Sequence, residues 1–170
     1  MDLISRMIEH HVWLVGEMLQ RAQRLSPAQL DSPIEISVEG IDPGASTRDT
    51  LARLVGQLAM WNATLDGRSY DFDVEGTQTL GDLQRVLASE GPAFLARVRE
   101  VVGEGRLDET FVDALCEPAQ VFTYGGMFAH VLTFSMFRRL MVLCALDVNG
   151  ITDLGSGDPM LWVADPAQQL

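Results

Sequence analysis

The residues of this chain that could do chemistry are three histidines and a few arginines on segments with helical patterns. His10, His11 and His130 are the only histidines in the 170 residues. A divalent transition metal generally needs three or more nitrogen, oxygen or sulfur donors that converge on it. His10 and His11 are adjacent and lie about 100° apart on a helix, so both cannot easily point at one ion. A site made of His11, His130 and a carboxylate is one hypothesis, and hydrogen-bonded core histidines are the more ordinary interpretation.

A second set of residues follows one side of a helix near the C-terminus. His130, Phe134 and Arg138 are spaced four residues apart, and each step turns a helix by only about 40°, so the three share a side. A guanidinium cannot ligate a metal because it stays protonated, and a phenyl ring has no lone pair to give. This side of the helix therefore offers one metal donor and one permanent cation.

Four segments with helical periodicity must position these residues. Apolar side chains recur at helical spacing in residues 3–25, 47–66, 79–102 and 124–147. Ser46 or Thr47 is expected to cap the second helix and Thr79 the third, while Gly91-Pro92 should kink or split the third. The fourth helix is apolar on most of its circumference, which predicts that it is the most buried element.

The connecting segments complete the expected fold. Ser26 and Pro27 indicate the start of a short helical turn, and residues 32–46 form a loop that crosses between the first two long helices. Residues 108–123 change period and predict a small hairpin or an extended arm before the last helix. Together the pattern predicts an all-α fold, a four-helix bundle that occupies residues 1–170 as a single domain.

Composition narrows the classes of partner. The formal net charge is -12, and all twelve basic residues are arginine. This balance repels nucleic-acid phosphates and anionic membrane surfaces, so we expect neither nucleic acid nor membrane as a partner. The start of the chain lacks a signal-peptide pattern, and Cys116 and Cys144 make no disulfide framework, which predicts a cytoplasmic protein. Trp13 and Trp61 are expected in the core, and Trp162 on the surface.

Several stretches in the same order resemble the DinB-like damage-inducible family. They are Glu9 to Val15, Arg24 to Pro33, Ser46 to Trp61, and His130 to Arg139. The family's bundle holds a divalent metal on three histidines, and the corresponding positions here carry Arg53, Phe134 and Arg138. The resemblance therefore implies the DinB-like bundle, with its long crossover between helices one and two, but neither a metal nor another cofactor.

In such a bundle Arg53 would face the side of the last helix that carries His130. Two interpretations follow. The arginines could pair with Asp49, Glu9 or another acid and close the site, or they could leave donors free to bind a carboxylate or phosphate bidentately. The candidate ligand pocket comprises His11, Arg53, His130, Phe134 and Arg138. Arg139 is expected to be a solvated or interface charge.

Three functional hypotheses follow from the resemblance and from the lost ligands. The first is a metal-free DinB-like protein, a stress-response or small-molecule binding module for an anionic ligand, that forms a homodimer. The second is an enzyme related to thiol-dependent transferases or isomerases, in which Arg53, His130 and Arg138 bind and polarise an anionic substrate. The third is a structural interaction protein with a filled bundle. No catalytic residue carries over from the family, so catalysis is left open.

Overall fold

The structure, a computed structural model, describes residues 2–36 and 40–165. Within them the chain is mostly helical, with one two-stranded sheet, which confirms the all-α expectation. The elements in chain order are α1 (Leu3–Ala22), α2 (Pro27–Asp31), α3 (Thr47–Leu65), η1 (Phe72–Thr77), α4 (Leu80–Gly103), β1 (Thr110–Asp113), β2 (Gln120–Thr123), α5 (Tyr124–Val148) and α6 (Pro159–Ala164).

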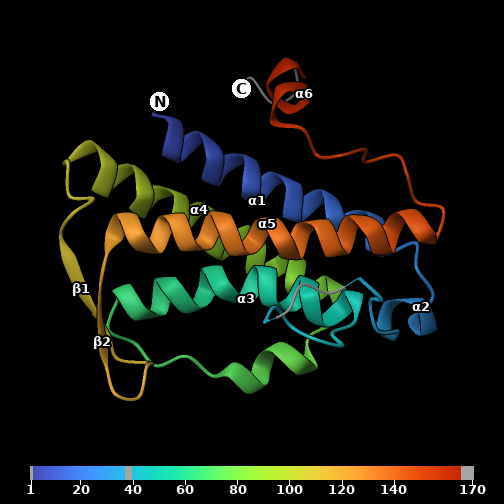
Figure 1. The fold of residues 1–170 in the computed structure, drawn as a ribbon, viewed down its shortest axis with the longest axis horizontal. Coiled ribbons are helices and arrows are strands. Elements are labelled where there is room, and N and C mark those ends of the chain that lie inside the picture. The colour runs from blue at the N-terminus through green and yellow to red at the C-terminus, as the bar shows by residue number, and fades with distance from the viewer. Residues whose placement is uncertain (1, 37–39, 166–170) are drawn as a thin grey trace.

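Four long helices pack around one core. α3 lies against α4 and α5, and α1 lies against the same two helices. α1 and α5 run in one direction, whereas α3 and α4 run in the opposite one (Figure 1). The expected connection between the first two long helices occupies residues 23–46. A second long connection, residues 66–79, runs back along α3 and carries η1, because α3 and α4 are parallel. The sequence did not reveal this second crossover.

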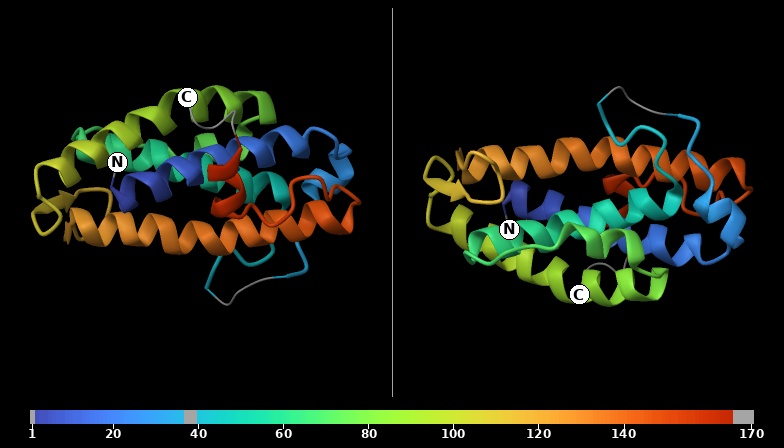
Figure 2. Two further views of the ribbon diagram at one scale, coloured as in Figure 1. Left: turned by 90° about the horizontal axis from the view of Figure 1, so that it is seen from above. Right: turned by 90° about the horizontal axis from the view of Figure 1, so that it is seen from below.

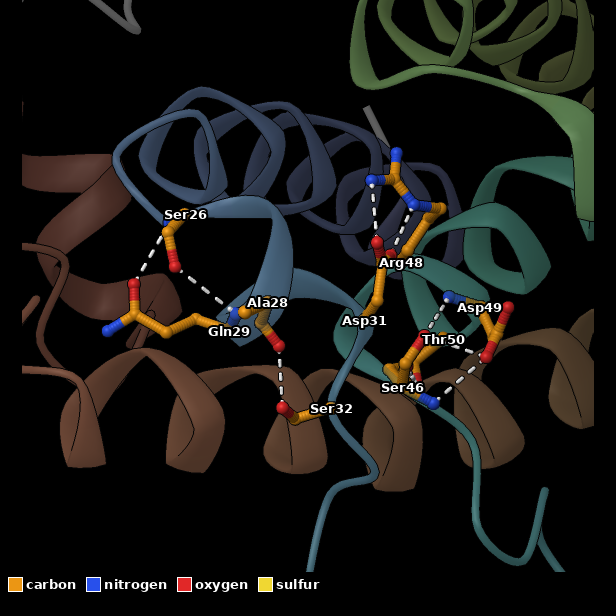
Figure 3. Close-up of polar contacts among 9 residues, drawn as sticks. All are labelled: Ser26, Ala28, Gln29, Asp31, Ser32, Ser46, Arg48, Asp49 and Thr50. Carbon is orange, nitrogen blue, oxygen red and sulfur yellow. Dashed lines mark hydrogen bonds and ion pairs between the residues drawn. The ribbon is translucent and has the colours of Figure 1, made fainter.

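Side-chain caps fix where the helices begin. The Ser46 hydroxyl accepts a hydrogen bond from the Asp49 amide, and the Asp49 carboxylate accepts one from the Ser46 amide (Figure 3). Ser26 and Gln29 form the same reciprocal box at α2. Arg48 of α3 then donates to Asp31 of α2 at 2.7 Å, which ties the two helix ends together. The predicted starts at Ser26, Ser46 and Thr79 are confirmed.

Two predictions about the long helices are corrected by the structure. Of the kink or split expected at Gly91-Pro92, the split is wrong, because α4 continues through both residues. Leu87 and Phe94, on either side, are buried in the same core, and this burial favours an unbroken helix over the cost of one missing hydrogen bond. α5 is not the most buried element. Its Met136 and Leu140 are each 52% exposed, although α1, α3 and the loop residues Ile34 and Ile41 pack on other parts of the helix.

The segment between α4 and α5 is a hairpin, as one of the two sequence interpretations had it. β1 and β2 pair antiparallel, with Thr110 opposite Thr123 and Asp113 opposite Gln120. Of the tryptophans, Trp61 is buried as expected and Trp13 is half-buried. Trp162 is also buried, contrary to the surface position predicted for it. None of the helices in the described residues has the length and apolar character needed to cross a membrane.

Candidate functional site

The five residues predicted to line one pocket come from α1, α3 and α5, and they do not meet on the same side of α5. His130 contacts Trp61 of α3 edge-on, with ring centroids 6.3 Å apart, and stacks on Phe134 at 4.4 Å. Arg138 is on the same helix, and Arg53 approaches from α3. His11 belongs to α1 and contacts α5 from another side, through Arg139. The structure thus separates His11 from the other four residues.

Arg53 is paired with a glutamate that the sequence did not single out. Its guanidinium donates to both carboxylate oxygens of Glu75, at 3.1 and 3.2 Å, and lies over the ring of Phe72. The Tyr70 hydroxyl donates to the same carboxylate at 2.9 Å. Burial, together with the charge of Glu75, raises the pKa of Tyr70, so its hydroxyl stays a donor. These contacts fasten the second crossover to α3.

Gly56 makes room for this carboxylate. A Cβ at position 56 would lie 2.6 Å from the Glu75 carboxyl carbon and 2.8 Å from the Tyr70 hydroxyl. Both distances are shorter than a non-bonded contact allows. The absence of a side chain at Gly56 therefore lets the Glu75 carboxylate rest on the backbone of α3.

Arg138 is paired as well. Its Nε donates to Asp42 at 2.5 Å and a second nitrogen donates at 3.3 Å, in the loop between α2 and α3. Asp49 and Glu9, the partners named from the sequence, are used elsewhere: Asp49 caps α3, and Glu9 pairs with Arg99. The geometry therefore matches the interpretation in which acids close the arginine site.

The small cavity that remains beside Arg53 is a poor place for an anion. It measures about 200 Å³, and its charged lining is Arg53 with three carboxylates, those of Asp42, Asp49 and Glu75. Asp42 is already paired with Arg138 and Glu75 with Arg53, and the additional carboxylate of Asp49 makes this cavity unfavourable for a further anion.

The residues at the DinB-like ligand positions do not fit a metal ion either. Arg53 and Arg138 are cationic and paired, and Phe134 has no donor. In the part of the chain that the structure describes, no three side chains of His, Cys, Asp or Glu gather as a metal ion would require.

Partial burial, and then the charges of Arg138 and Arg53, lower the pKa of His130.

A larger groove lies between α1, α5 and α6. Its volume is about 800 Å³, and α6 lies across α1 and α5 (Figure 2, left). Its walls are mostly apolar and comprise Leu3, Met7, Leu14, Leu132, Met136, Phe137, Leu140, Leu143, Pro159, Trp162 and Val163, with Arg6, His10, Thr133, Arg139, Ser156 and Gly157 supplying polar atoms. The volume falls within the range of small-molecule sites, about 300–1,000 Å³.

One hydrogen bond and a cluster of rings hold the α6 wall in place. His10 Nε2 contacts the carbonyl oxygen of Gly157 at 2.9 Å. Gly157 has a positive φ of 66°, and a Cβ there would lie 2.7 Å from Leu14, so a larger residue would push the segment away from α1. The rings of Trp162 and His10 meet edge-on at 5.4 Å, and Trp13 lies beside both.

Arg139, expected to be a solvated or interface charge, is half-buried and lines this groove. Its guanidinium lies 2.8 Å from Nδ1 of His11, which is fully buried. Burial, and then the charge of Arg139, lowers the pKa of His11 to about 3. His11 is therefore neutral at pH 7, so it accepts a hydrogen bond from Arg139 but supplies no counter-charge.

Arg6 and Arg139 differ from the other arginines. Ten of the twelve arginines pair with a carboxylate, namely Arg21, Arg24, Arg48, Arg53, Arg68, Arg85, Arg97, Arg99, Arg106 and Arg138. Among residues 2–36 and 40–165, Arg6 and Arg139 have no such partner, and both line the groove. The Arg6 guanidinium lies over the Trp162 ring, 5.8 Å from its centroid. In a chain of net charge -12, the two arginines without a carboxylate share one cavity.

The comparisons with known proteins give no further guide. No protein-family model matches the chain, and a search of curated proteins found no match. The family resemblance therefore stays a proposal, and the site must be judged on its own geometry.

Substituting Gly56 tests the contact between α3 and the second crossover. Gly56→Ala should lower the free energy of unfolding by about 1–3 kcal/mol, because the new methyl displaces the Glu75 carboxylate. Gly81→Ala in α4 is the control, since its Cβ meets nothing closer than 3.8 Å and alanine favours helix. Urea unfolding measures both. A Gly56→Ala protein as stable as the wild type would contradict the tight fit.

The neutral state of His11 predicts how stability depends on pH. Well above pH 6.5, the ordinary pKa of histidine, His11 is neutral in both the folded and the unfolded protein. Below pH 6.5 the unfolded chain binds a proton at His11 but the folded protein does not, so the folded protein loses stability as the pH falls. Between pH 7.5 and 5 this loss is about 2 kcal/mol.

His11→Asn keeps an acceptor for Arg139 but does not titrate. The stability that this variant loses between pH 7.5 and 5 should therefore be smaller than that of the wild type by about 2 kcal/mol. Urea unfolding at several pH values measures the loss. His130→Asn serves for comparison: the pKa of His130 is lowered as well, but this histidine is exposed, so its removal should reduce the loss by less than His11→Asn does. An unchanged pH dependence in His11→Asn would mean that His11 is protonated in the folded protein.

Proposed function

We propose that this chain is a DinB-like protein without the family metal site, and that it binds a small anionic ligand in the groove between α1, α5 and α6. The observation that carries the proposal is the pair Arg6 and Arg139, which have no carboxylate partner in the described residues and line the same groove. Arg6 is exposed, but Arg139 is half-buried. A guanidinium partly removed from water is costly without a counter-charge, and a bound anion would supply one to Arg139.

The geometry supports this place for the anion over the one proposed from the sequence. Arg53 donates hydrogen bonds to Glu75, and Arg138 donates to Asp42. At Arg139, one nitrogen donates to neutral His11. Arg139 also lines the groove, and among the described residues no carboxylate pairs with it. Four long helices around one core also accord with the DinB-like bundle.

The resemblance has two further implications, which stay proposals. Stress response is the role expected of the family, and a homodimer is its expected assembly. Sedimentation equilibrium checks the second: we expect a mass close to twice the 18.7 kDa of one chain, and a monomer at micromolar concentration would contradict it. An enzyme that uses Arg53, His130 and Arg138 is the weaker alternative, because both arginines are already neutralised by acids.

A thermal-shift measurement with octanoate tests the proposed function at constant ionic strength. A ligand at a hundredfold excess over its Kd stabilises the folded state by about 2.7 kcal/mol, roughly 5–10 °C in Tm for a chain of this size. We expect such a rise for the wild type. Arg139→Gln should abolish it, and Arg53→Gln should keep it.

Each other result has a defined meaning. If octanoate fails to raise the Tm, the groove is not an anion site and the proposal is wrong. If Arg53→Gln abolishes the rise and Arg139→Gln does not, the anion binds beside α3, as the sequence hypothesis had it.

A further inference from the structure

The walls of the groove restrict the kind of anion that fits it. Leu3 and Met7 of α1 are 73% and 44% exposed, and Met136 and Leu140 of α5 are each 52% exposed. All four line the groove. Exposed apolar side chains gathered in one concave surface are a common mark of a binding site.

The polar atoms of the groove are few. His10 is engaged with Gly157 and lies between two tryptophan rings. Thr133 and Ser156 contribute hydroxyls, and the positive charge comes from Arg6 and Arg139. Asp158 lies near enough for its charge to raise the pKa of His10 slightly against the larger effect of burial. Its carboxylate caps α6 by accepting a hydrogen bond from the Met160 amide, and it pairs with neither Arg6 nor Arg139. A ligand covered with polar groups would therefore leave most of them without partners in this groove.

We infer that the ligand is an amphipathic carboxylate: its carboxylate binds Arg139, with Arg6 contributing, and its apolar chain lies along Leu3, Met7, Met136 and Leu140. This inference rests on the proposed function, since it specifies the anion bound in the same groove. The charge of the arginines favours a carboxylate head group, because a carboxylate matches the two-pronged donor face of a guanidinium. The exposed leucines and methionines favour an apolar tail, because its binding removes apolar surface of both the ligand and the groove from water. Methionine side chains also adapt to tails of different shape.

The binding of straight-chain carboxylates from butyrate to decanoate tests the inference by isothermal titration calorimetry. We expect the affinity of the wild type to rise roughly two- to fourfold per added methylene until the groove is filled. Leu140→Asn should flatten this increase. Val148→Asn is the matched control on the same helix, because Val148 is 80% exposed and does not line the groove; it should leave the increase unchanged. 1-Decanol, which lacks the charge, should bind at least tenfold more weakly than decanoate.

The possible failures are distinguishable. If butyrate and decanoate bind equally and both need Arg139, the amphipathic inference is wrong and the proposed function stands. If no carboxylate binds, both are wrong. If decanoate binds equally well to Arg139→Gln, the groove is an apolar site without anion recognition, and again both fail. If no carboxylate binds and Leu140→Asn converts a dimer to a monomer, the groove is occupied by a second copy of the chain.

Discussion

A guanidinium that is taken out of water needs a negative charge nearby, and this requirement decides how the less exposed arginines are placed. Three of them meet it with an acid of another element: Arg53 with η1, Arg138 with the loop before α3, and Arg48 with α2. Within residues 2–36 and 40–165, Arg139 has no carboxylate partner and bonds to the neutral His11. The charge left over at the groove is the feature on which our account of the function depends.

The contrast between Arg138 and Arg139 shows how one helix can serve two purposes. Adjacent residues on a helix point about 100° apart, so the two guanidinium groups leave α5 toward different neighbours. Arg138 turns to the loop between α2 and α3, where Asp42 neutralises it. Arg139 turns to α1 and the groove, where the surrounding side chains are apolar. Arg138 is thus neutralised beside α3, whereas the charge of Arg139 beside α1 has no carboxylate partner in the described residues.

Much of the fold could be predicted from the sequence, because its signals are local. Ser26, Ser46 and Thr79 are capping residues with the right partners three positions later, and the four long apolar repeats could only be helices. The second crossover was missed because it depends on Tyr70 and Glu75 packing against Gly56, which lies in the preceding helix and meets them only in the folded chain.

The candidate site was harder to predict for the same reason. The sequence pointed to Arg53 and Arg138, but no local pattern could show that Glu75 and Asp42 would neutralise them. Arg139 was expected to be a solvated or interface charge, since nothing near it in sequence indicates that it bonds to His11 and lines the groove. One signal was available: α5 is apolar around most of its circumference, more than two neighbouring helices can cover. That excess marks the wall of the groove.

The most direct measurement is a crystal structure of the protein soaked with 10-bromodecanoic acid, whose bromine is located by its anomalous scattering. Our account predicts that the carboxylate lies within hydrogen-bonding distance of the Arg139 guanidinium and that the bromine lies against the apolar wall formed by Met136 and Leu140. A carboxylate bound at Arg53 or directed into solvent, or a bromine outside the groove, would contradict it.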